Sequence, residues 1–215
     1  MTSRRRLPIL VMALAFAVGG AASPASAQPV SPWTYTFEVF GNVGYGRLVS
    51  GDNEWGKGGD YGFAVGLRPL AGGLQGLGFE VQASWLAGSH AAGSQASNEV
   101  NANLFAANVL YHFRGRTRVQ PYIVGGLGVL HVNYTQRCVD CVFDWDPATG
   151  EWVSRGVSEW QERGTKAGFT FGGGAKIAIQ RHLSIRPEFL LTDTTAGSGY
   201  NWGLLQWRVG VGVHF

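Results

Sequence analysis

Two cysteines followed by three acidic residues are the side chains of this sequence that could form a redox or metal site. Cys138 and Cys141 make a C-x-x-C pair, and Asp144, Asp146 and Glu151 follow within the next ten residues. A structural zinc site needs about four ligands, and a thioredoxin-type redox pair needs a βαβ context that is not present. In an oxidising compartment such a pair is typical of a small loop disulfide, and this is the pairing we predict.

The acidic residues surround a turn sequence, Asp146-Pro147-Ala148-Thr149-Gly150. Their spacing lacks most of the ligand pattern of a calcium-binding EF-hand loop. Pro followed by Gly favours a β-turn, and apolar residues stand on both sides of it. These are Phe143, Trp145, Trp152 and Val153. The segment therefore predicts a β-hairpin without a metal.

A third group contains a candidate nucleophile. His182 and Ser184 stand two residues apart and Glu188 follows, and a serine nucleophile needs a base within hydrogen-bond reach. The remaining histidines are scattered and suggest no cluster: His90, His112, His131 and His214. Whether the group can act depends on where the chain places it.

The composition restricts the elements that can position these residues. The chain has 215 residues, of which 33 are Gly and only 14% are charged, against typical values of about 7% Gly and 25% charge. Low charge and many aromatic residues (8 Trp, 7 Tyr and 12 Phe) argue against disorder. A soluble enzyme with so few charges would have a poorly solvated surface, so part of this surface is expected to contact something other than water.

The N-terminus has the pattern of a secretory signal peptide. Arg4, Arg5 and Arg6 precede an uncharged, mostly apolar run over 7–18, and small residues lead to the Ala25-Ser26-Ala27 site. The apolar run is shorter than the roughly 20 residues that a membrane-spanning helix needs. We predict a cleaved signal peptide over 1–27 and export through the Sec pathway. Its removal takes away three Arg and no acid, so 14 basic and 14 acidic residues remain and nothing supports nucleic-acid binding.

After residue 27 no run of 18 apolar residues occurs, and the dominant pattern has a period of two. Between Leu205 and Phe215 every second residue is apolar, and the residues between them are polar or Gly. The same alternation marks 61–68, 77–86 and 183–192, and more loosely 33–48, 101–113, 119–133 and 166–180. These eight segments predict eight strands, although the phase around Gly125 and Gly126 is ambiguous.

The predicted connections alternate in length. Long ones fall at 49–59, 87–100, 134–165 and 193–201, and short ones at 71–76, 114–118 and 181–182, with 134–165 the longest. Strict alternation predicts an antiparallel up-and-down β-barrel with short turns at one end and long loops at the other. An immunoglobulin-type sandwich has no reason to produce it.

The alternation also predicts which face points into the barrel. A soluble barrel with a ligand cavity would place its apolar residues inside, but the chain has only three Lys to solvate a polar outer face. Gly suits a narrow interior, and buried charges need partners. We predict an interior network of Glu38, Arg68, Glu80, Lys176, Arg186, Glu188 and Arg208. Outward aromatic residues predict two girdles: Tyr45, Tyr61, Trp85, Tyr134 and Trp202 near the long loops, and Trp33, Tyr35, Tyr111, Phe113, Tyr122 and Phe215 near the short turns.

The signal peptide, the eight-strand rhythm and the final segment WRVGVGVHF resemble a small Gram-negative outer-membrane β-barrel protein of the OmpA-like, outer membrane protein beta-barrel domain group. QPYIVGGLGV (120–129), NVLYHF (108–113) and LSIRPEF (183–189) strengthen this resemblance. It implies an all-β, eight-stranded antiparallel transmembrane barrel over 28–215 in the outer membrane, with short periplasmic turns, long extracellular loops, and lipid and lipopolysaccharide around it. It also implies that the barrel-assembly machinery reads the alternating C-terminal residues, namely Trp207, Val209, Val211, Val213 and Phe215.

The resemblance is specific for architecture and poor for function, because this fold hosts many roles. We expect a non-enzymatic protein without cofactor or metal, with a structural role or a surface ligand bound through loop 134–165. One alternative is a narrow porin-like channel, although side chains fill an eight-stranded barrel. The other is a lipid A deacylase-like enzyme, which carries a His-x-Ser pair near the outer rim. Here His182 falls in the short turn at 181–182, at the wrong leaflet, and Thr192-Asp193-Thr194-Thr195 at the outer end lacks a His.

Overall fold

The computed structural model describes residues 37–50, 53–68, 76–91, 96–113, 118–139, 143–154, 156–194 and 201–215. The predicted signal peptide over 1–27, the girdle residues Trp33 and Tyr35, and Cys141 lie outside these ranges. The predictions made for them stay predictions.

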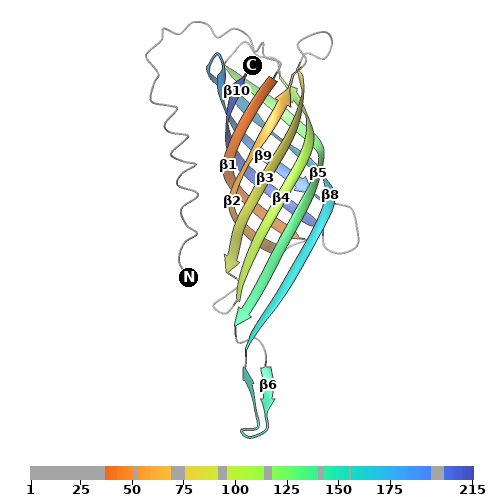
Figure 1. Ribbon diagram of the computed structural model, residues 1–215, viewed down its shortest axis with the longest axis vertical. Coiled ribbons are helices and arrows are strands. Elements are labelled where there is room, and N and C mark those ends of the chain that lie inside the picture. The colour runs from red at the N-terminus through yellow and green to blue at the C-terminus, as the bar shows by residue number, and fades with distance from the viewer. Residues whose placement is uncertain are drawn as a thin grey trace. The chain divides into compact units, whose positions relative to one another are not determined.

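Eight strands form a closed antiparallel barrel (Figure 1), in the order β1-β10-β9-β8-β5-β4-β3-β2. They are β1 (Phe37–Ser50), β2 (Asn53–Leu67), β3 (Leu77–Ala91), β4 (Ala96–His112), β5 (Val119–Val139), β8 (Val157–Gln180), β9 (Leu183–Asp193) and β10 (Trp202–His214). Two short strands, β6 (Phe143–Asp146) and β7 (Glu151–Ser154), form a separate hairpin between β5 and β8. The predicted all-β, eight-stranded antiparallel barrel is confirmed. In the parts of the chain that the structure describes, no helix is long and apolar enough to cross a membrane.

The barrel closes through its first and last strands. β1 and β10 pair continuously from Glu38 opposite His214 to Ser50 opposite Trp202. The Phe215 amide also donates a hydrogen bond to the Phe37 carbonyl, at 2.9 Å. Closure satisfies backbone groups that lipid cannot hydrogen-bond. We call the end that holds Phe37 and Phe215 the terminal end, and the opposite end, where β5 ends and β8 begins, the hairpin end.

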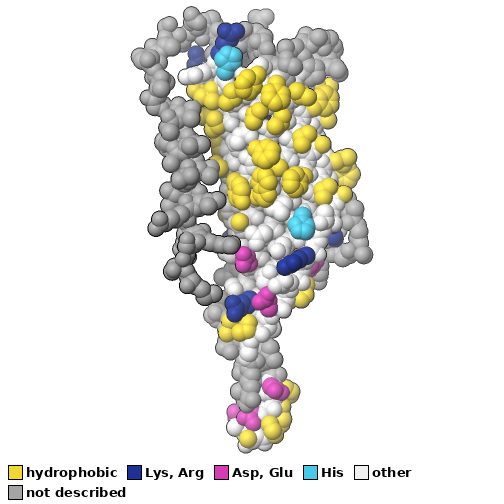
Figure 2. All heavy atoms as spheres, viewed as in Figure 1, with side chains coloured by type: hydrophobic (Ala, Val, Ile, Leu, Met, Phe, Trp, Pro, Cys, Tyr) yellow, Lys and Arg dark blue, Asp and Glu magenta, His cyan; other side chains and the backbone are white. Residues whose placement is uncertain are grey.

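The outer face of the barrel carries an apolar belt. Exposed and buried residues alternate along most of each barrel strand, although the first five residues of β8 (157–161) are all exposed. In β5 the pattern continues without a break through Gly125 and Gly126. Figure 2 shows apolar side chains gathered over the half of the barrel nearer the terminal end, with charged side chains closer to the hairpin end. Large exposed members of this belt include Val43, Phe63, Val81, Ile123, Leu127, Phe171 and Val209. The predicted outward direction of the apolar face is confirmed.

The strands are longer at the hairpin end than predicted. β1 reaches Ser50 and β2 begins at Asn53, so most of the predicted loop 49–59 is strand. The predicted loops 87–100 and 134–165 also shorten, to 92–95 and to 140–156 with the hairpin inside it. The strict alternation of long and short connections is therefore wrong. These extensions carry polar residues outside and lie beyond the apolar belt, so they show no lipid-facing alternation although the backbone ladder continues.

The hairpin forms around the predicted turn. The Gly150 amide donates to the Asp146 carbonyl at 2.9 Å, and the Ala148 amide donates to Asp146 Oδ1 at 2.9 Å. Gly150 has φ of 69°, a left-handed conformation that Gly adopts without the Cβ penalty of other residues. The predicted hairpin is confirmed.

Candidate functional site

Near the terminal end, the lumen contains a buried ion pair between β1 and β8. The Lys176 ammonium donates to Glu38 Oε1, and both side chains are almost fully buried. His214 Nδ1 lies 3.6 Å from the second oxygen of Glu38. This contact ties β1, β8 and β10 together inside the barrel.

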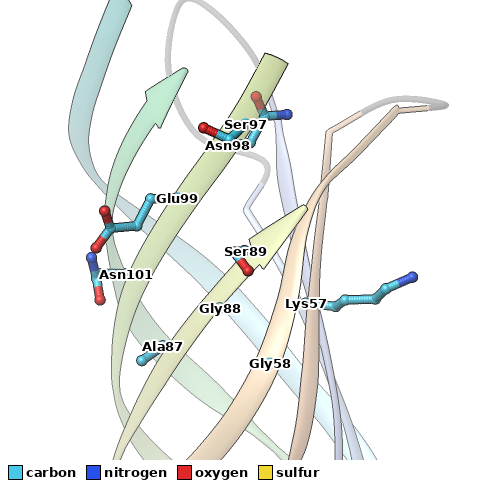
Figure 3. Close-up of a pocket in the computed structure, with 9 residues that line it drawn as sticks. All are labelled: Lys57, Gly58, Ala87, Gly88, Ser89, Ser97, Asn98, Glu99 and Asn101. Carbon is cyan, nitrogen blue, oxygen red and sulfur yellow. The ribbon is translucent and has the colours of Figure 1, made fainter. Parts of the chain in front are cut away.

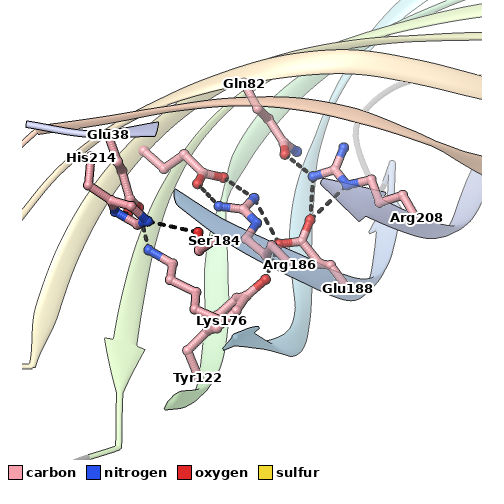
Figure 4. A network of polar contacts seen from close by, with 10 residues as sticks. Glu38, Gln82, Tyr122, Lys176, Ser184, Arg186, Glu188, Arg208 and His214 are labelled. Carbon is pink, nitrogen blue, oxygen red and sulfur yellow. Dashed lines mark hydrogen bonds and ion pairs between the residues drawn. The ribbon is translucent and has the colours of Figure 1, made fainter. Parts of the chain in front are cut away.

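A second set of ion pairs crosses the lumen (Figure 4). Arg186 on β9 makes a two-point contact with Glu80 on β3, one bond of which measures 3.0 Å. Arg186 Nη2 also lies 2.9 Å from Glu188 Oε2. Arg208 Nε donates to Glu188 Oε1 at 2.7 Å, and the Tyr122 hydroxyl donates to Glu188 Oε2. Glu188 therefore accepts from two guanidinium groups and one phenol.

An inward aromatic ring contacts two cations of this network. The Phe40 ring centroid lies 4.4 Å from the Arg186 guanidinium carbon and 5.2 Å from the Lys176 ammonium. Cations over an aromatic face gain electrostatic stabilisation that grows when the site is dry. Phe40 thus stabilises two like charges that lie in the same part of the lumen.

Sequence reasoning missed one acidic member of the interior network, Asp60. This residue is 2% exposed, and its Oδ1 accepts a hydrogen bond of 2.9 Å from Gln206 Nε2. It lay just outside the predicted loop 49–59, next to two glycines that suggested a turn. Its even number places it in the same inward row as Gly62, Ala64 and Gly66, and this spacing is the signal that could have found it.

The structure brings the seven predicted charged residues and Asp60 into one interior. Arg68 lies at the terminal end, where its Nη1 donates to Gln120 Oε1 at 3.0 Å. Among the described residues, the buried acids of this network are Glu38, Asp60, Glu80 and Glu188, and the buried bases are Lys176, Arg186 and Arg208. Charges of both signs suit a medium of low dielectric, in which a buried charge needs a partner. The arrangement fills the lumen and links strands on opposite sides of it.

The half of the lumen nearer the hairpin end contains a large apolar cluster, whereas the sequence predicted a polar, charge-paired interior. The cluster is formed by Leu48, Trp55, Leu86, Val100, Ala102, Leu104, Ala106, Leu130, Val132, Tyr134, Trp202 and Leu204. The Trp55 ring centroid lies 4.6 Å from that of Tyr134 and 6.4 Å from that of Trp202. These rings pack together inside the lumen at this end.

Three aromatic residues predicted for the lipid-facing girdles point inward instead. Tyr122, Tyr134 and Trp202 are only 1–5% exposed, whereas Tyr45 and Tyr61 face outward as predicted. Tyr134 and Trp202 point inward because the solvent outside the barrel changes at their level. Beyond the belt the outer face meets water, so polar residues turn outward and apolar residues turn inward. Tyr122 faces inward because its hydroxyl contacts Glu188.

The candidate nucleophile does not meet the histidine next to it in sequence. His182 lies in the two-residue turn after β8, and its Nδ1 is 3.1 Å from the His214 carbonyl. Ser184 Oγ instead lies 2.8 Å from His214 Nε2, and His214 faces Glu38. This serine–histidine–glutamate order resembles a catalytic triad, but Ser184 is 0% exposed and has no access to a substrate in this state.

The structure describes only one of the two cysteines of the predicted disulfide. Cys138 is disulfide-bonded, and Cys141 is the other cysteine of the chain but lies outside the described residues. Across the described ranges, no three His, Cys, Asp or Glu side chains are grouped so that they could hold a metal ion.

A closed eight-stranded barrel with an apolar outer belt and a charge-paired lumen defines an integral outer-membrane β-barrel protein. Residues 12–215 match the family model for the outer membrane protein beta-barrel domain. The match spans nearly the whole chain, and the chain belongs to this family. The protein is therefore a component of the Gram-negative outer membrane.

Several solved outer-membrane structures are similar to this chain at low sequence identity. The neisserial surface protein A (NspA) superposes with a TM-score of 0.60 and 17% identity, over 83% of this chain and 97% of that chain. A major outer membrane protein of Thermus thermophilus gives 0.49 and 15% identity, over 85% and 100%. The attachment invasion locus protein Ail of Yersinia pestis gives 0.47 and 11%, over 84% and 99%. No curated protein matches the sequence.

Proposed function

We propose that the protein is a closed, non-enzymatic barrel that displays a recognition surface outside the cell. The observation that carries this proposal is a pair of tryptophans on the β6–β7 hairpin. Trp145 and Trp152 stand directly opposite each other, with ring centroids 5.7 Å apart. They are 48% and 67% exposed. Exposed aromatic surface of this kind is typical of interaction sites, where Trp is enriched.

The charge of the hairpin favours a partner other than the cell's own membrane. Asp144, Asp146 and Glu151 are its charged residues, and no Lys or Arg occurs between Phe143 and Ser154. Lipopolysaccharide is anionic, and like charges repel. The tryptophan pair is thereby kept available to a molecule that approaches from outside.

The filled lumen supports a closed barrel rather than a channel. Arg186 reaches from β9 to Glu80 on β3, and the interior of eight strands is just wide enough for side chains to fill it. Aromatic rings at Trp55, Tyr134 and Trp202 pack together at the hairpin end of the lumen. The buried position of Ser184 supports the non-enzymatic part of the proposal.

Adhesion of whole cells tests the recognition role. Cells that display the wild-type barrel, the W145S/W152S variant or the control T149S would be applied to immobilised extracellular-matrix proteins and to epithelial monolayers. We expect the double variant to lose binding and the control to retain it, with equal surface levels and equal resistance to SDS before boiling. Equal adhesion of all three proteins would overturn the recognition role and leave a structural one.

Two further measurements test the closed, non-enzymatic state. Planar bilayers that contain the purified barrel should show no conductance steps, and regular steps would contradict a closed lumen. Mass spectra of lipid A from cells with and without the protein should be identical. A loss of one acyl chain that depends on Ser184 would overturn the non-enzymatic assignment.

A further inference from the structure

At the hairpin end of the lumen three aromatic rings meet at steep angles. The Trp160 ring is inclined by 70° to Trp55 and by 71° to Tyr134, with ring centroids 6.3 Å and 5.7 Å apart. Trp55 and Tyr134 are 8% and 5% exposed, whereas Trp160 is 47% exposed. We call these three residues the aromatic corner. It has a buried floor and one wall that is open to water.

The strand register places a carboxylate beside this corner. Glu162 is directly opposite Tyr134 across β5 and β8, and directly opposed residues have Cβ atoms about 4.5–5.5 Å apart. Glu162 Oε2 is shielded from solvent and accepts no hydrogen bond from the described residues. The next base in the same row of β8, Lys166, lies over the Trp202 ring instead, 5.1 Å from its centroid. The corner thus contains a carboxylate oxygen that is available to a donor.

A second such acceptor lies two strands away. Asn98 on β4 is opposite Gln136 on β5, and Gln136 is opposite Trp160 on β8, so the three residues share one row. Asn98 is 6% exposed, and its Oδ1 accepts no hydrogen bond from the described residues. Figure 3 shows Asn98 near the start of β4, with the exposed Glu99 further along the strand. At about 4.8 Å between neighbouring strands, the strands that carry the two acceptors are roughly 10 Å apart.

Acceptors on two sides of an aromatic surface favour a ligand with two cationic donors joined by an apolar chain. A buried acceptor without a donor costs free energy, and hydrogen bonds from a charged donor are the stronger ones. A Trp ring also attracts a cation within about 6 Å of its centroid, and its exposed part can cover an alkyl chain. An aliphatic diamine has all of these properties. The small exposed area of the corner favours a free molecule over a lysine side chain on a protein surface.

We propose that the aromatic corner binds a small aliphatic diamine or polyamine. One ammonium group donates to Glu162 and lies against Trp160, the chain crosses β5, and the second ammonium group donates to Asn98. These residues belong to the barrel strands, so the inference goes beyond the recognition role proposed for the hairpin and does not depend on it.

Isothermal titration calorimetry of the folded barrel in a neutral detergent at low salt tests the ligand. The probes are diaminopentane, pentanediol as its uncharged analogue, and a Gly-Lys-Gly peptide with blocked termini that carries one ammonium group. We expect diaminopentane to bind, and the diol and the peptide to bind at least about tenfold more weakly. Equal binding of the diol would overturn the charged contact. Equally tight binding of the peptide would overturn the assignment to a small free amine.

Two variants test the corner itself. E162Q removes the carboxylate and W160L removes the ring, and each should weaken diaminopentane binding by about tenfold or more. E159Q is the matched control, because Glu159 is exposed on the same strand and accepts from Gln161. Resistance to SDS before boiling shows that each variant remains folded. Unchanged binding in E162Q or W160L, or an equal loss in E159Q, would overturn the proposal.

A third variant tests the contact at the second ammonium group. N98A should weaken diaminopentane binding about threefold or more while the binding of aminopentane, which has one ammonium group, stays the same. A loss for both amines, or for neither, would overturn the two-point contact. The hairpin variant W145S/W152S should bind diaminopentane like wild type. Loss of diamine binding in that variant would overturn a separate site, whereas loss of adhesion alone concerns only the recognition role.

Discussion

The ion pairs of Glu188 allow a quantitative test of the interior network. Its carboxylate lies 2.9 Å from Arg186 Nη2 and accepts from Arg208 Nε at 2.7 Å. In Glu188→Gln one oxygen becomes an amide N–H₂ group, which donates and cannot accept from a guanidinium. Arg186 retains Glu80, but Arg208 retains only the neutral Gln82 as a side-chain partner among those described. The substitution therefore leaves a buried cation without a carboxylate.

The expected cost follows from the burial of both partners. Glu188 and Arg208 are 6% and 3% exposed, and breaking such a buried pair costs about 3–5 kcal/mol. Since each 1.4 kcal/mol is a factor of ten, the folded-to-unfolded ratio should fall by roughly two to four powers of ten. Removing the stranded cation as well, in E188Q/R208Q, should restore more than about 1 kcal/mol of the loss, because coupled neighbours are not additive.

Equilibrium urea unfolding in lipid vesicles, followed by tryptophan fluorescence, measures these differences. Glu159→Gln is the control, since Glu159 is exposed and accepts from Gln161 at 2.6 Å, and its change should stay within about 0.5 kcal/mol. A loss below about 1 kcal/mol in E188Q would refute the assignment of Glu188 as the acceptor that balances two guanidinium groups. A double variant less stable than E188Q alone would refute the argument from uncompensated charge.

Four other outcomes follow from the same contacts. Asp60→Asn should cost about 1–2 kcal/mol in the same unfolding assay, less than E188Q, because the donor to its carboxylate is the neutral amide of Gln206. Trp202→Ala should cost about 3–5 kcal/mol by opening a cavity in the apolar lumen, and a cost near zero would mean that the ring does not pack there. Gly44→Ala should abolish the SDS-resistant form on unboiled gels, because its Cβ would meet the backbone of Trp207 and Arg208, whereas Gly41→Ala on the same strand should migrate like wild type, since nothing lies within 4 Å. Phe215→Ala should reduce the amount of barrel in the outer membrane of living cells while refolding into vesicles stays efficient; an equal loss in both assays would instead assign Phe215 a role in stability.

Alternation in the sequence determined much of the architecture. A side chain on a strand meets one of two media, lipid outside or the crowded lumen inside, so a period of two marks each strand through the belt. The same period assigned Glu38, Glu80, Lys176, Arg186, Glu188 and Arg208 to the interior, where all six are buried. The turn chemistry of Asp146 to Gly150 acts through neighbouring residues, and it was sufficient to predict the hairpin.

Only the tertiary structure decided which interior charges meet. Arg186 crosses the lumen to Glu80, 106 residues away in sequence, and Lys176 reaches Glu38 across 138. Such partners depend on strand order and register, which a local pattern does not contain. The tertiary structure also decided the inward positions of Tyr134 and Trp202. Beyond the belt, water replaces lipid as the outer solvent, and the preference of each face is reversed while the backbone ladder continues, with one register shift between β1 and β2 at Leu48/Val49.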